Sequence, residues 1–171
     1  GKISCVAKGA RRPKSALLAG TQMFCFGEYM VYKGTSTYHI NSVEPIEIFY
    51  NLRTDLDKLK YAVHINKIVQ DVTHENQNCY NILQLLLNTL YTISETDKDL
   101  DFVLSVFKLR LLCILGFMPN IKECVNCKGK EDLDFFSIKD DGFKCKICGK
   151  QDTSALSINK STKSAIIYTI T

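Results

Sequence analysis

The chain has 171 residues, of which 46% are hydrophobic and 23% charged, a composition that is typical of a folded globular protein and argues against disorder. No run approaches 18 uncharged apolar residues, and the start of the sequence lacks the apolar core of a signal peptide, so we expect no membrane partner and a cytoplasmic location. The net charge of +4 is too small to indicate a class of partner, but its distribution along the chain is informative.

The first 45 residues have the pattern of a β-sheet with a basic loop. Short β-prone runs occur at residues 3–7, 21–26, 29–32 and 38–43, and this spacing predicts a small barrel or sandwich over residues 1–45. Five basic residues precede the first acidic residue, Glu28, and these are Lys2, Lys8, Arg11, Arg12 and Lys14. Because Gly9 and Pro13 favour a loop there, the sequence predicts an exposed basic patch.

After Pro45 the hydrophobic period becomes helical, and residues 46–171 are expected to form an α-helical domain. Apolar residues at helical spacing predict helices near residues 55–72, 80–94 and 100–115, and Gly116 and Pro119 would end the third. A last helix is predicted toward residue 171, with Ser157 or Ser161 as its N-terminal cap.

Two Cys-x-x-Cys pairs lie between the third and the last of these helices. Cys124 and Cys127 form the first pair and Cys145 and Cys148 the second, a spacing that is typical of a four-thiolate zinc site. The residues between the pairs predict short strands at 135–138 and 143–145. We therefore predict a zinc ribbon inserted at about residues 120–151.

Four cysteine ligands close the coordination shell to water, so the predicted zinc ion is structural rather than catalytic. A redox-active dithiol is the alternative, but that motif is expected beside a βαβ pattern, which the flanking sequence does not show. His74-Glu75 lacks the second histidine of a metalloprotease helix, and the His-x-Glu signature of a zinc deaminase is absent from the sequence. Since no paired carboxylates, Ser-His-Asp set or phosphate-binding glycine loop stands out, we expect that the protein is not an enzyme.

Three motifs follow one another along the chain. A β segment with Gly-Lys-Ile-Ser at residues 1–4 is followed by Lys-Gly-Ala-Arg-Arg-Pro-Lys-Ser at residues 8–15, then by helices and the two cysteine pairs. This order resembles the RecO family of bacterial DNA repair proteins, and the resemblance covers nearly the whole chain. It implies an α+β fold, in which an N-terminal OB-fold-like β-barrel precedes an α-helical domain with an inserted zinc ribbon. Because the family has further strands before residue 1 and further helix after residue 171, the barrel is expected to be incomplete here.

The resemblance also implies a function. RecO proteins are recombination mediators that bind single- and double-stranded DNA, anneal complementary strands and load RecA together with RecR and single-stranded-DNA-binding protein, so a nucleoid-associated bacterial protein is expected. The family's DNA-contacting basic residues correspond to Lys8, Arg11, Arg12 and Lys14, which stand in the matching motif. One or two of the aromatic residues in the β segment are expected to stack on bases. The alternative is a zinc-ribbon protein-interaction scaffold without direct DNA binding.

Overall fold

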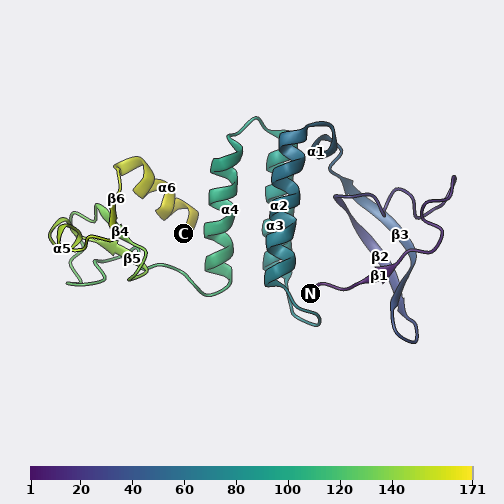
Figure 1. Cartoon of the computed structure of the whole chain (residues 1–171), viewed down its shortest axis with the longest axis horizontal. Coiled ribbons are helices and arrows are strands. Elements are labelled where there is room, and N and C mark those ends of the chain that lie inside the picture. Colours follow the sequence, from purple (N-terminus) through teal and green to yellow (C-terminus); the bar gives the residue numbers. More distant parts are fainter. Residues whose placement is uncertain (171) are drawn as a thin grey trace. The chain divides into compact units, whose positions relative to one another are not determined.

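The computed structural model describes residues 1–170, in which strands come first, helices follow, and a second small sheet lies near the end. Figure 1 shows these elements in chain order. The chain divides into two compact units, Gly1–Leu104 and Ser105–Thr171, which we describe separately. No helix within residues 1–170 is long and apolar enough to cross a membrane.

The first unit begins with a three-stranded sheet whose strands lie in the order β1-β3-β2. The strands are β1 at Cys5–Val6, β2 at Cys25–Lys33 and β3 at Tyr38–Ile48. Strands β2 and β3 form an antiparallel hairpin, whereas β1 pairs in parallel with β3. Within residues 1–170 no pairing joins β1 to β2, so the sheet is open and does not close into a barrel.

Strand β3 is longer than the sequence suggests because it continues through Pro45 to Ile48. Pro45 lies opposite Gly27, next to a register shift between Phe26 and Gly27. A proline has no N–H to donate to the ladder and is tolerated at such a bulge, where regular pairing is interrupted. The prediction that the β pattern stops at Pro45 is therefore wrong by a few residues.

The segment between β1 and β2 is a chain of successive turns that covers one face of the sheet. Its buried side chains are Ala10, Leu17 and Phe24. The Tyr29 hydroxyl in β2 donates a hydrogen bond of 2.7 Å to the Gly20 carbonyl oxygen, and Val43 in β3 packs closely against Gly20. These contacts attach the turns to the sheet from the side to which Tyr29 and Val43 point.

Three helices lie entirely within the first unit, and they are α1 at Asn51–Thr54, α2 at Leu56–Val72 and α3 at Tyr80–Glu95. Asp55 caps α2, since its Oδ1 accepts hydrogen bonds from the N–H groups of Asp57 at 2.8 Å and Lys58 at 3.0 Å. Leu52, Ile65 and Ile93 are fully or almost fully buried, one from each helix. The bounds of α2 and α3 agree with the predicted helices, while α1 is an addition to them.

The unit boundary falls within helix α4, which spans Leu100–Ile114. The second unit then contains β4 at Phe135–Ser137, β5 at Gly142–Lys144, α5 at Lys146–Gln151, β6 at Ala155–Ser157 and α6 at Lys160–Ile170. Its sheet has the order β5-β4-β6, and both pairings are antiparallel. Asn159 caps α6 by accepting a hydrogen bond of 2.7 Å from the Thr162 N–H, so the predicted serine cap is wrong.

Candidate functional site

The four paired cysteines converge in the second unit. The Sγ atoms of Cys124, Cys127, Cys145 and Cys148 all lie within 4.8 Å of one another, although the two pairs come from separate turns. The sulfurs of Cys127 and Cys145 are 3.7 Å apart, too far for a disulfide. A tetrahedral zinc ion with Zn–S bonds of about 2.3 Å would separate its sulfurs by roughly 3.8 Å. The cluster can therefore hold a metal ion and its geometry is compatible with zinc.

Backbone hydrogen bonds shape both cysteine turns. In the first turn the Cys124 N–H donates to the Gly129 carbonyl oxygen at 2.7 Å, and the Lys128 N–H donates to the Cys124 carbonyl oxygen at 2.9 Å. Lys128 has a φ of 63°, so it is this residue that takes the left-handed conformation of the turn. In the second turn Cys145 caps helix α5, and its Sγ accepts a hydrogen bond of 3.5 Å from the Cys148 N–H.

These hydrogen bonds change the acidity of the thiols. Burial alone would raise the pKa of Cys124, but N–H donors from Cys127 and Cys145 outweigh it and lower the pKa to about 6. The backbone hydrogen bond from Cys148 likewise lowers the pKa of Cys145. The pKa of Cys148 rises to about 12 because its thiol is hydrogen-bonded to the Cys145 sulfur. The cluster thus favours thiolates at one cysteine of each turn, and thiolate is the form that binds metal.

A small hydrophobic cluster lies beneath the first cysteine turn. Cys124, Leu133 and Phe143 are buried there, and the rings of Phe136 and Phe143 meet edge to face with centroids 5.9 Å apart. The Val125 N–H also donates a hydrogen bond of 2.9 Å to the Phe143 carbonyl oxygen. The turn is therefore attached to strand β5 by both packing and hydrogen bonding.

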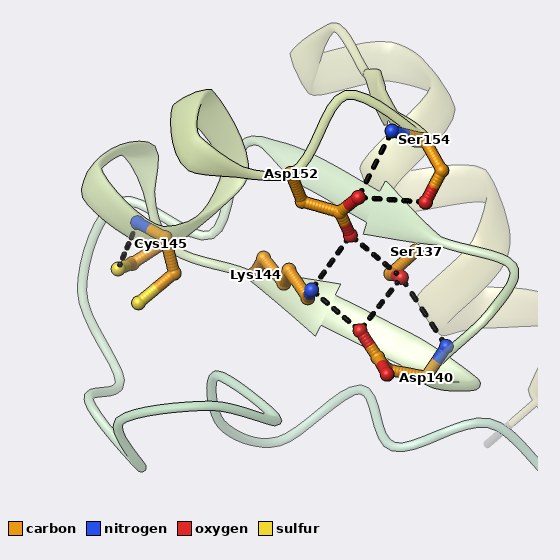
Figure 2. A network of polar contacts seen from close by, with 7 residues as sticks. Ser137, Asp140, Lys144, Cys145, Asp152 and Ser154 are labelled. Carbon is orange, nitrogen blue, oxygen red and sulfur yellow. Dashed lines mark hydrogen bonds and ion pairs between the residues drawn. The ribbon is translucent and has the colours of Figure 1, made fainter.

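A buried polar network supports the second cysteine turn (Figure 2). Lys144 in β5 has a side chain only 4% exposed, and its Nζ lies 2.5 Å from Asp140 Oδ2 and 2.7 Å from Asp152 Oδ2. The buried Ser137 hydroxyl donates to the same two carboxylate oxygens, at 3.1 Å and 3.2 Å. Asp152 also accepts from the N–H and hydroxyl of Ser154, at 2.9 Å and 2.6 Å. Every charged member of this network is thus paired.

The network holds its members in their charged forms. Hydrogen bonds with Asp140 and Asp152 raise the pKa of Lys144, and the hydrogen bond from Lys144 lowers the pKa of each carboxyl group. Sequence analysis missed this network because it brings together a strand, a turn and the end of a short helix. The sequence feature that could have indicated the network is Lys144, which directly precedes Cys145 in the otherwise apolar strand Gly142–Lys144.

The lysines that the sequence does place near the cysteines are exposed. Lys128 pairs with Glu123 at 3.2 Å, while Lys122, Lys146 and Lys150 remain on the surface. They do not reach into the network around Lys144. In this part of the molecule, therefore, the buried lysine supports the fold, and the surface lysines are accessible to solvent.

The predicted basic patch lies in the first unit, on the turns between β1 and β2. Lys8, Arg11, Arg12 and Lys14 are all exposed, and among residues 1–170 no acidic side chain forms an ion pair with any of them. We call these four residues the basic segment. The Arg12 N–H donates to the Gly9 carbonyl oxygen at 3.0 Å and the Ser15 N–H to the Arg12 carbonyl oxygen at 3.1 Å, so the turns are ordered. Gly9 has a φ of 75°, which glycine adopts readily.

Comparisons with known proteins agree on one family. A family model described as the N-terminal part of recombination protein O matches residues 1–49, and one described as its C-terminal part matches residues 53–169. The chain is 44% identical to the DNA repair protein RecO of Acetivibrio thermocellus over 171 residues, which cover 99% of this chain and 68% of that protein. It is 40% identical to RecO of Alkaliphilus metalliredigens over 163 residues, which cover 95% of this chain and 66% of that protein.

A third relative, RecO of Thermoanaerobacter, is 32% identical over 98% of this chain and 68% of its own. The chain therefore spans about two thirds of the length of the curated relatives that it matches. Both halves of the sequence match the same family, and each of the three matches extends over at least 95% of the chain. The chain thus belongs to the RecO family of DNA repair proteins, whose role is in DNA repair and recombination.

Proposed function

We propose that the chain is a nonenzymatic recombination mediator that binds single- and double-stranded DNA through Lys8, Arg11, Arg12 and Lys14. The observation that carries this proposal is the exposure of four neighbouring cations that lack acidic partners among the described residues. Arg11 and Arg12 also line a shallow hollow of about 470 Å³ on the same turns. Such a surface is suited to phosphates rather than to a specific base sequence.

Charge repulsion within the basic segment supplies the driving force. Like charges placed so close together repel one another, and a polyanion relieves that repulsion while it releases its own condensed counterions. Binding of this kind is largely independent of sequence. It also promotes annealing of complementary strands, because neutralising both backbones lowers the barrier to their approach.

We further propose that residues 1–45 are part of an OB-fold and that residues 46–171 form a helical domain with the zinc ribbon inserted at about 120–151. The open sheet β1-β3-β2 supports the first part, because its strands can join further strands at both edges. One structural zinc ion bound by Cys124, Cys127, Cys145 and Cys148 would supply folding energy to the ribbon. Its closed shell of four cysteines leaves no coordination position for a substrate.

The proposed partners follow from family membership. Three relatives carry the name DNA repair protein RecO, and we propose that this chain also acts in DNA repair. We further propose that it works with RecR and single-stranded-DNA-binding protein to assist the loading of RecA. The site of action would be the nucleoid in the bacterial cytoplasm. Because the chain spans about two thirds of these relatives, the activities belong to the whole protein, and the DNA contact is the step to test first.

A salt titration tests the DNA contact. Fluorescence anisotropy with a labelled single-stranded oligonucleotide gives the dissociation constant at several salt concentrations, for the native chain and for a variant with all four basic residues changed to alanine. The slope of log affinity against log salt should fall by about 3, since each phosphate contact on a single strand contributes roughly 0.7. The variant should also fail to speed annealing.

A matched control removes the same charge elsewhere, at four exposed lysines, Lys60, Lys98, Lys130 and Lys139. The control variant should keep the native salt slope. If the basic-segment variant retained native affinity and slope with its circular dichroism unchanged, the scaffold function would be favoured instead. One observation supports that second candidate: Ile147, between Cys145 and Cys148, is 73% exposed and offers an apolar contact for a protein partner.

A further inference from the structure

One face of the sheet β1-β3-β2 is left uncovered within the described first unit. The turns between β1 and β2 cover the side to which Tyr29 and Val43 point. Because side chains alternate along a strand, Met30 and Tyr32 point to the opposite side. Met30 is 62% exposed and Tyr32 52% exposed, so this second face presents large apolar groups to solvent. Figure 1 shows β2 and β3 as the long hairpin that carries it.

Three side chains form a row across this face, one from each strand. His39 in β3 is the direct partner of Val6 in β1 and of Tyr32 in β2. The rings of Tyr32 and His39 stack with centroids 5.2 Å apart and planes 26° from parallel. The Thr37 hydroxyl lies 3.3 Å from His39 Nε2 and helps to fix that ring. An aromatic pair with a set orientation is therefore present on the surface before any ligand binds.

Charge differs between the two ends of the face. Lys33, an exposed cation, follows Tyr32 directly in the sequence, and Lys8 comes two residues after Val6, the partner of His39. At the other end of the same face Glu28 and Glu44 are directly opposite each other on β2 and β3. A polyanion is repelled by that acidic pair, so the end of the face that carries Tyr32 and His39 is the end open to it.

We propose that the stacked pair of Tyr32 and His39 is a platform for an unpaired base of the single-stranded DNA that the chain is proposed to bind. The inference rests on the proposed DNA binding and identifies the residues that would contact the bases. Every base has a π face, so stacking on an aromatic ring tolerates any sequence, while the paired bases of a duplex are unavailable for it. The platform therefore gives the chain a preference for single strands that phosphate contacts alone do not provide.

The test compares two labelled oligonucleotides of equal length, oligo(dT) and the same backbone with abasic residues in place of the thymidines. The native chain should bind oligo(dT) more tightly than the abasic backbone. Tyr32→Leu keeps an apolar side chain but removes the π face, and it should weaken oligo(dT) binding about tenfold, the scale of one stacked base. The same change should leave abasic binding and the salt slope unaltered. Tyr32→Phe should retain native binding to both.

Tyr91→Leu is the matched control, because Tyr91 is a comparably exposed tyrosine on helix α3, and it should change neither affinity. Equal affinity of the native chain for the two oligonucleotides would overturn the platform and leave the proposed phosphate contacts standing. An equal loss of both affinities in Tyr32→Leu would also overturn it, since the side chain would then support the fold or an apolar protein partner. If the native chain bound neither oligonucleotide, the proposed function itself would fail and the platform with it.

Discussion

Lys144 and Asp152 form an ion pair, with Nζ 2.7 Å from Oδ2, that joins strand β5 to the residue after helix α5. Lys144 directly precedes Cys145, and Asp152 follows the helix that carries Cys148. The pair therefore closes the second cysteine turn from both of its ends. Removal of Lys144 would leave the carboxylates of Asp140 and Asp152 without their shared cation, and removal of Asp152 would leave Lys144 with Asp140 alone, so both partners matter to the stability of the turn.

Asp152→Asn should lower the thermal stability of the chain at neutral pH. The hydrogen bond from Lys144 depresses the pKa of Asp152 in the folded state, so the carboxylate contributes stability above its unfolded pKa of about 3.9. That contribution should be lost as the pH falls from about 4 through the lower folded pKa. Melting temperatures of the native chain and the variant should therefore differ most at neutral pH and converge in acid.

The difference in melting temperature between the native chain and Asp152→Asn isolates the effect of the Asp152 carboxylate. Protonation of the cysteine sulfurs at low pH changes the stability of both proteins equally. Lys146→Ala, which removes an exposed lysine of the same turn, should leave the pH dependence native. A constant difference in melting temperature from neutral pH to acid would contradict the assigned role of Asp152.

The double change Cys124→Ser and Cys145→Ser should abolish metal binding and unfold the part of the second unit around Phe143. One cysteine is lost from each turn, and a structural zinc site contributes folding energy directly. Elemental analysis of protein purified without chelators should find one zinc per native chain and none in the variant. Cys113→Ser, outside the cluster, should retain the metal. Native protein without zinc, or metal retained by the double variant, would refute the zinc assignment.

Gly149→Ala should destabilise the second unit by about 1–3 kcal/mol, the usual effect of overpacking. An added Cβ would overlap the ring of Phe135, which packs directly against the Gly149 backbone, so strand β4 and helix α5 would have to separate. Urea unfolding followed by circular dichroism measures the loss. Lys150→Ala is the control at the next, exposed position and should have little effect. Equal stabilities of the two variants would show that the close contact is unimportant.

Glu44→Lys should stabilise the hairpin by about 0.5 kcal/mol, because it turns a pair of like charges directly across the strands into an opposite pair with Glu28. Glu47→Lys makes the same change of net charge on β3, but residue 47 faces Phe26. The free energy of unfolding in urea should therefore rise for the first variant and not for the second. Equal gains would indicate a general effect of net charge rather than the cross-strand pair.

The sequence predicts the elements whose signals are local. Apolar periodicity located helices α2, α3 and α4 to within about a residue or two, and the cysteine spacing identified a cluster that the structure brings together. Strand β6 and the short helix α5 escaped prediction because their formation depends on pairing with β4 and on the second cysteine turn.

Pairing between distant segments explains the other features that differ between the sequence-based predictions and the structure. Pro45 lies within β3 because the bulge opposite Gly27 accommodates it, and a bulge cannot be read from one strand alone. The stack of Tyr32 on His39 and the contacts of Lys144 depend on strand register in the same way. The β segment contains several aromatic residues, and the sequence alone does not indicate which of them could stack on a base. Only exposure and neighbours in the structure distinguish Tyr32 from the others.

The parallel pairing of β1 with β3 has a consequence for the order of folding. The β2–β3 hairpin closes through a short connection, whereas β1 adds only two residues of pairing and must close a long loop first. We expect the hairpin amides to become protected from hydrogen exchange early in refolding and the amides of Cys5 and Val6 to become protected late. In the native state the amides of Cys5 and Val6 should exchange their hydrogens faster than the paired amides of β2 and β3. The basic segment lies inside that loop, so the arrangement of its cations would be the last feature of the first unit to form.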